Sequence, residues 1–80
     1  MIYSILKTEL DLEELNNKIV FSSRDSQYLI MNSLTYETLV KQAVKPDLQK
    51  FERGAWYYSS YKGLYIAICE NLNYGEVDII

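Results

Sequence analysis

The chain contains no histidine, a single cysteine, a single proline and only three glycines among its 80 residues. Without histidine it lacks the commonest general base and metal ligand, which excludes a hydrolytic triad and a histidine-ligated zinc site. One cysteine can form neither an internal disulfide nor a thiolate zinc cluster, and this cysteine usage fits a reducing cytoplasm. The glycines, Gly54, Gly63 and Gly75, stand far apart, so a glycine-rich phosphate loop is excluded as well.

Strong charge of either sign is also missing. Eight basic residues against 11 acidic ones give a net charge of −3 at pH 7. An acidic domain binds nucleic acid poorly, because phosphate neutralisation needs clustered lysine and arginine. The apolar stretch at residues 1–6 is too short for a signal peptide, and no apolar run approaches the length of a membrane span. We therefore expect a cytoplasmic protein that has no membrane partner and for which nucleic acid is the less favoured partner.

The composition that remains is typical of one folded domain. Hydrophobic residues make up 49% of the chain and charged residues 24%, which argues against disorder. A chain of 80 residues has no room for a second domain, so residues 1–80 are expected to form a single one.

The last third of the chain, residues 55–80, is expected to form three strands joined by two tight turns. Leu64–Cys69 is apolar at six successive positions, which predicts a central strand buried on both faces, and Gln27–Met31 has the same character. Gly63 and Gly75 occupy the expected turns, where a positive φ is wanted.

Two helices are expected, one before the strand at Gln27–Met31 and one directly after it. Asp11, followed three residues later by Glu14, resembles a capping box, and the helix that it begins should end near residues 16–17. A short strand is then expected at Ile19–Phe21. Asn32 or Ser33 should cap the second helix, which is expected to continue through residue 44 because Pro46 forbids further extension. Residues 47–53 could hold one more helical turn.

The elements together predict an α+β fold, with two helices packed on one face of a small, mainly antiparallel β-sheet. The strand at Gln27–Met31 is followed by a helix and further strands, so it could add one parallel pairing. The sequence leaves the strand order open.

Aromatic residues are the unusual feature of the composition. Eight tyrosines and one tryptophan exceed what so small a core needs, and many of them fall in residues 56–74. Successive residues of a strand face opposite sides, so one face cannot take all of them, and exposed tyrosine and tryptophan mark protein interfaces. A tyrosine-rich core with hydroxyl groups at its rim is the competing interpretation. The candidates for an interface are Trp56, Tyr57, Tyr58, Tyr61 and Tyr74.

Chemically active residues offer two weaker alternatives. Glu70, Glu76 and Asp78 lie near one turn and could hold a metal in a small metal-dependent enzyme or nucleotide-binding subunit. A cationic stretch could instead serve a single-stranded nucleic-acid-binding module together with tyrosine stacking; its members are Lys41, Lys45, Lys50 and Arg53. Solvated surface charge is the simpler explanation of both groups. We assign no catalytic residue, cofactor or metal, and expect a protein that is not an enzyme.

One segment carries a resemblance to a known family. Tyr28–Leu39 resembles a strand-to-helix segment of the tailed-phage major capsid protein and encapsulin family, and residues 61–68 and 71–75 are similar to the strand and glycine-containing turn that follow it there. The resemblance covers about half of the chain and is confined to the capsid's axial domain. The spine helix, extended loop and peripheral domain have no counterpart, and Ser33 replaces a proline common in the family. The resemblance implies a phage or prophage protein that works through assembly contacts.

The leading hypothesis is a small non-enzymatic protein-interaction or assembly protein that binds through an aromatic-rich β-sheet surface. Its partner would be itself, as a homodimer, or a larger protein. Residues 77–80 are expected to form an open sheet edge guarded by Asp78 alone, through which two chains could pair.

Overall fold

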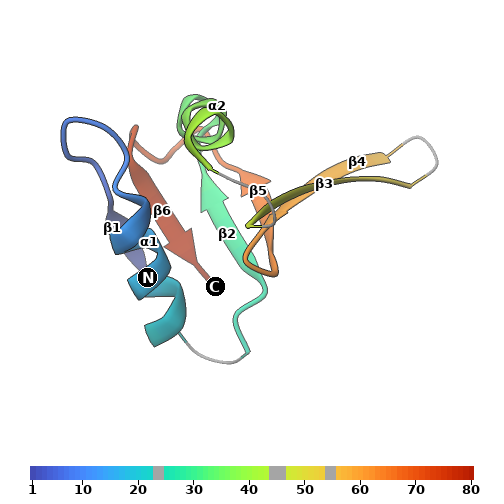
Figure 1. Cartoon of the computed structure of the whole chain (residues 1–80), viewed down its shortest axis with the longest axis horizontal. Helices are drawn as coiled ribbons and strands as arrows, with labels where there is room; N and C mark the ends of the chain where they lie inside the picture. The colour runs from blue at the N-terminus through green and yellow to red at the C-terminus, as the bar shows by residue number, and fades with distance from the viewer. Residues whose placement is uncertain (23–24, 44–46, 54–55) are drawn as a thin grey trace.

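A computed structural model describes residues 1–22, 25–43, 47–53 and 56–80, without the side chains of residues 52, 53, 56 and 57. This part of the chain forms two helices and six strands (Figure 1). In chain order they are β1 (Ile2–Ser4), α1 (Leu12–Phe21), β2 (Tyr28–Met31), α2 (Ser33–Gln42), β3 (Leu48–Arg53), β4 (Trp56–Tyr61), β5 (Leu64–Ile68) and β6 (Glu76–Ile79).

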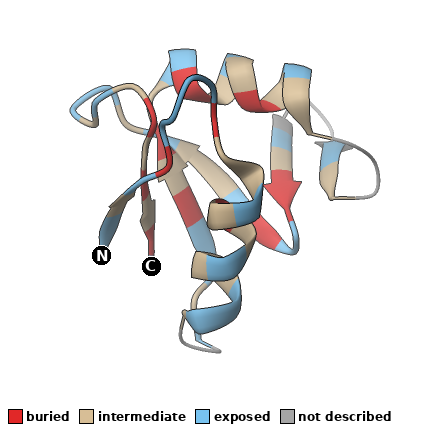
Figure 2. Cartoon of the chain, turned by 60° about the vertical axis from the view of Figure 1, so that its left-hand side comes forward, coloured by how far each residue is buried: buried red, intermediate tan, exposed pale blue. Residues whose placement is uncertain are grey.

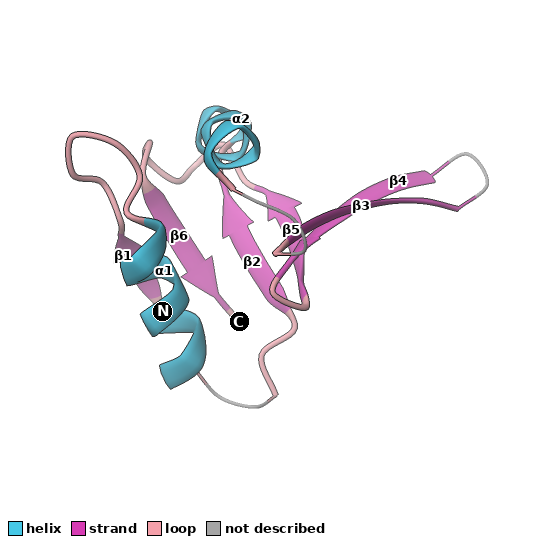
Figure 3. Cartoon of the chain, in the orientation of Figure 1, coloured by secondary structure: helices cyan, strands magenta, loops and turns pink. Residues whose placement is uncertain are grey.

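The six strands form one sheet in the order β1-β6-β2-β5-β4-β3, in which β2 and β5 are parallel and the other neighbours antiparallel. The predicted α+β fold is thereby confirmed (Figure 3). The expected meander of the last third is wrong in its second half, because β2 lies between β5 and β6. β6 consequently has a neighbour on each side, so the predicted open edge at residues 77–80 is also wrong. The backbones of Tyr28 and Ile80 bond each other in both directions, which keeps this end of β6 attached to β2.

Both helices pack on the same face of the sheet. Leu29 and Met31 of β2 and Val77 of β6 are fully buried beneath them. Leu15 of α1 and Leu39 of α2 complete this core from the helical side. Figure 2 shows buried residues in red on α2 and on the strands of the sheet.

The opposite face of the sheet carries neither α1 nor α2. On this face lie Tyr28 of β2 and Tyr65 of β5, which are 43% and 50% exposed. The expectation that both strands are buried on both faces is therefore wrong. Their apolar side chains alternate between a covered and an uncovered face because both helices lie on one side.

The helix boundaries confirm the capping signals and correct one strand. Asp11 caps α1, its side chain accepting a hydrogen bond from the backbone N–H of Glu14, and Asn32 caps α2 in the same way. α1 continues through Phe21, so the expected end of this helix near residues 16–17 and the short strand expected at Ile19–Phe21 are both wrong. Ile19 lies one turn beyond Leu15 and packs against the core, which favours continuation of the helix. α2 ends at Gln42 and Ala43 after it has an extended backbone, so the expectation that the second helix continues through residue 44 is wrong.

Residues 48–53 form β3 rather than the expected helical turn. All six of them pair with β4, from Leu48 opposite Tyr61 to Arg53 opposite Trp56. Strand pairing with a distant segment here overrides a local preference that was marginal. The β3–β4 hairpin extends away from the rest of the sheet (Figure 1).

Candidate interaction surface

Four aromatic side chains form a row across the uncovered face of the sheet. Phe51 of β3, Tyr58 of β4, Tyr65 of β5 and Tyr28 of β2 follow one another with ring centroids 5.0, 5.7 and 6.2 Å apart. We call these four residues the aromatic row. It crosses four of the six strands of the sheet, including the parallel pair at its centre.

Strand register brings the row together. Phe51 is directly opposite Tyr58, and Tyr28 is directly opposite Tyr65. Tyr65 pairs with Ser60 of β4, so Tyr58 is its diagonal neighbour, a separation that aromatic side chains can bridge. Each member alternates with a residue that faces the helices, and this alternation places all four on the uncovered side.

The aromatic row is exposed and uncharged. Its members are 37–50% exposed, and Ile80, which is 54% exposed, continues it beside Tyr28. Successive rings meet at interplanar angles of 19°, 70° and 45°. Phe51 and Tyr58 stack, whereas the next two pairs are edge-on and tilted, so the four rings together do not form one flat platform for successive bases. An irregular surface of ring faces and edges suits the side chains of another protein.

The five predicted interface residues have different environments. Tyr58 belongs to the aromatic row, whereas Tyr61 is 1% exposed and lies in the core. Tyr74 is half-buried, and its hydroxyl donates a hydrogen bond to Thr38 of α2. Trp56 and Tyr57 lie in β4, but their side chains are outside the described part of the structure.

The pKa of Tyr61 reflects the burial of its side chain. Burial of the phenol raises the pKa of Tyr61 above its ordinary value, and the negative charge of Asp47 acts in the same direction. Tyr61 and Tyr74 therefore fulfil the competing interpretation of a tyrosine-rich core, while Tyr58 stands on the surface.

Phe51, Tyr65 and Tyr28 were not among the predicted interface residues. Tyr28 begins the apolar segment of β2 and Tyr65 lies within that of β5, and the hydrophobicity of both segments predicts burial. Their exposure could have been inferred from the alternation of one covered and one uncovered face. Their alignment could not, because it depends on the parallel pairing of β2 with β5.

The three carboxylates of the enzyme alternative have separate local contacts. Glu70 accepts hydrogen bonds from the backbone N–H and the hydroxyl of Ser33 at the start of α2. Glu76 accepts from the backbone N–H of Asn73, and Asp78 forms an ion pair of 2.8 Å with the N-terminal amino group. Within the described residues, no three acidic or cysteine side chains gather where they could hold a metal ion.

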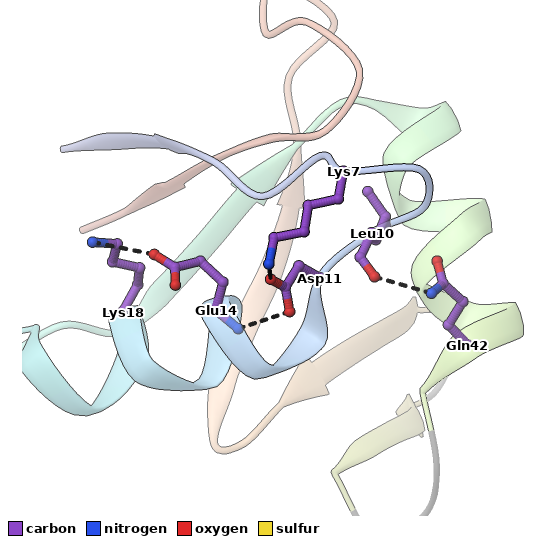
Figure 4. Close-up of polar contacts among 6 residues, drawn as sticks. All are labelled: Lys7, Leu10, Asp11, Glu14, Lys18 and Gln42. Atoms are coloured by element: carbon purple, nitrogen blue, oxygen red, sulfur yellow. Dashed lines mark hydrogen bonds and ion pairs between the residues drawn. The ribbon is translucent and has the colours of Figure 1, made fainter.

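Two carboxylates at the start of α1, those of Asp11 and Glu14, form ion pairs with nearby lysines (Figure 4). Asp11 forms an ion pair of 2.9 Å with Lys7, and Glu14 one of 3.4 Å with Lys18. The hydrogen bond from Lys7 and that from the backbone N–H of Glu14 hold the pKa of Asp11 below its usual value. Figure 4 also shows Gln42 donating to the carbonyl of Leu10, which attaches α2 to this segment.

The cationic stretch is scattered over several elements. Lys41 is exposed on α2 and Lys50 is exposed on β3. Lys45 and the side chain of Arg53 lie outside the described residues. Cys69, which follows β5, is half-buried rather than deep in a strand.

No protein-family model, curated protein or solved structure matches this chain. Neither of the helices in the described part of the chain is long and apolar enough to cross a membrane.

Proposed function

We propose that the chain is a small non-enzymatic protein-interaction module that self-associates through the aromatic row. The observation that carries this proposal is the uncovered line of four neighbouring rings, Phe51, Tyr58, Tyr65 and Tyr28. Aromatic residues are enriched at the centres of protein interfaces, and covering them removes apolar surface from water.

A second copy of the chain is the occupant that we propose for this surface. The net charge of −3 on each chain opposes pairing, but an uncharged contact surface adds no local charge repulsion to it. The row is uncharged, and Ile80, Ile30 and Ala67 adjoin it on the same face. Asp78 on that face is paired with the N-terminal amino group, which reduces its repulsion. A two-fold symmetric contact places the same patch on both chains, and a stable one buries about 800 Å² from each.

Light scattering at micromolar concentration tests the proposal. The wild-type chain should have twice the 9.4 kDa mass of one chain. The double variant Tyr58→Ser, Tyr65→Ser should be monomeric, because it replaces the two central rings. Phe21→Ser is the matched control, since Phe21 is an 86% exposed aromatic residue at the end of α1, which packs on the other face of the sheet. A wild-type species of 9.4 kDa would contradict self-association.

The resemblance to the capsid axial domain supports a more specific version, in which the module is a phage or prophage assembly protein. It rests on Tyr28–Leu39, a segment that forms β2 and the first part of α2. The position of the gene tests this version: a neighbourhood of phage structural genes would support it, and an operon of housekeeping genes would contradict it.

A further inference from the structure

In the described part of the chain, β4 and β5 pair with each other at two residue positions only. The two strands pair at Ser60 with Tyr65 and at Tyr61 with Leu64, next to the turn that joins them. Farther along, the β3–β4 hairpin diverges from the sheet (Figure 1). The segment Ile66–Ile68 of β5 therefore keeps β2 as its neighbour on one side and has no paired strand on the other among the described residues.

The backbone of this segment offers hydrogen-bonding groups on its free side. Tyr65 and Cys69 donate their backbone N–H groups toward β2, to the carbonyls of Gln27 and Met31. Because the direction alternates along a strand, Ile66 and Ile68 direct their N–H and C=O groups away from β2. This short stretch is a sheet edge within the fold, and it carries neither proline nor a charged residue to block pairing.

A cavity of about 230 Å³ lies beside the edge. Its apolar walls are Ile66 and Ile68 from β5, Tyr36 from α2, and Phe51 and Tyr58 from the hairpin. A hydrogen bond of 2.7 Å between the hydroxyls of Tyr36 and Ser59 joins α2 to β4 at its margin. The cavity has room for one large apolar side chain of a guest.

Lys50 supplies the charge at this site. It is the charged residue of the cavity lining, it is exposed, and it forms no ion pair with any described residue. A guest with a carboxylate at this point would gain a charge-assisted contact, whereas a basic guest would be repelled.

We propose that the β5 edge at Ile66–Ile68 binds an extended peptide segment of a partner protein by strand addition. The peptide's backbone pairs with Ile66 and Ile68, an apolar side chain enters the cavity, and an acidic side chain faces Lys50. Main-chain hydrogen bonds supply affinity in this mode and the side-chain pockets supply specificity. The proposal deepens the proposed interaction role. It uses the β5 edge, whereas self-association uses the open face, and the two sites share Phe51 and Tyr58.

Selection from a library of short random peptides displayed on yeast tests the proposal. The bait is the wild-type chain, with Tyr65→Ser, which alters the aromatic row outside the cavity, as a second bait. Both should enrich sequences with apolar residues at alternate positions and an aspartate or glutamate near them. Failure of either bait to enrich any sequence above background would overturn the proposal.

The most enriched sequence is then synthesised and titrated into folded variants. Ile68→Lys should abolish binding, since it places a charge at the half-exposed edge. Val20→Lys is its control and should bind normally, because Val20 is an exposed residue of α1. Lys50→Glu should weaken binding by about fivefold, as expected for an exposed charge pair, and should select basic peptides instead. Lys41→Glu is the matched charge control. An unchanged acidic preference with Lys50→Glu would contradict the proposed contact.

Amide hydrogen exchange locates the bound peptide. The amides of Ile66 and Ile68 should gain protection when the peptide is added, while that of Ala67, which already faces β2, should change little. Protection elsewhere, with these two amides unaffected, would overturn the strand-addition proposal. Loss of self-association in Tyr65→Ser with retained peptide binding would separate this proposal from the homodimer.

Discussion

The hydroxyl of Tyr61 donates a hydrogen bond to Oδ1 of Asn16 across 2.7 Å, joining β4 to α1. The Tyr61 ring is 1% exposed, so this polar contact sits at the margin of the core. β4 belongs to the hairpin that extends away from the sheet, and its base is thus held against the N-terminal helix. The Tyr61 side chain thus contributes both apolar packing in the core and a hydrogen bond between residues 45 positions apart in the chain.

Replacing Tyr61 by phenylalanine should lower the free energy of unfolding by about 1 kcal/mol, because Asn16 Oδ1 loses its donor in a partly buried setting. Urea unfolding followed by circular dichroism measures the change. Tyr65→Phe is the control, since Tyr65 lies on the exposed face and its hydroxyl is not engaged within the described residues. Equal stability of wild type and Tyr61→Phe would show that the hydrogen bond contributes nothing net.

Stability should fall in alkaline solution as a consequence of the Tyr61 pKa. Burial raises that pKa in the folded state, so between the unfolded and folded values the unfolded chain has lost a proton that the folded chain keeps. The contribution of this group is complete below the unfolded pKa of about 10 and is lost as the pH rises through the folded value. Unfolding of wild type and Tyr61→Phe, compared from pH 9 upward, measures this loss. A parallel decline of the two proteins would contradict the prediction.

Leu29 and Ile30 are neighbours on β2 that face opposite sides of the sheet. Leu29→Ala should cost about 2–5 kcal/mol, because it opens a cavity beneath the helices where the side chain is fully buried. Ile30→Ala should cost clearly less, since Ile30 is half-buried on the uncovered face. Thermal unfolding ranks the two variants, and equal losses would mean that the second face is covered in solution.

Gly63 and Gly75 both have a positive φ, +85° and +83°, as the sequence predicts for the two turns. A Cβ at Gly75 would lie 2.5 Å from Cβ of Leu6, whereas one at Gly63 would meet open space. Gly63→Ala should therefore cost roughly 1 kcal/mol from backbone strain alone, and Gly75→Ala more than that. Chemical denaturation of the two variants tests the order. The reverse order would contradict the close approach at Gly75.

Local signals in the sequence determined the parts of the fold that depend on neighbouring residues. Asp11 and Asn32 begin their helices because their side chains accept from a backbone N–H three residues ahead, a contact that needs no distant partner. Gly63 and Gly75 adopt left-handed geometry for a similarly local reason. In β6 the apolar Val77 is buried and the acidic Asp78 half-buried, an alternation of period two that the sequence already contains.

The tertiary structure decided what depends on pairing between distant segments. β6 is an inner strand because it pairs with both β1 and β2, and residues 48–53 are a strand because β4 pairs with all of them. The aromatic row exists because β2 and β5 run parallel with Tyr28 opposite Tyr65. A period of two in the sequence places each ring on one of two faces, but only the register aligns rings from four strands, and the register is set by contacts between residues far apart in the chain.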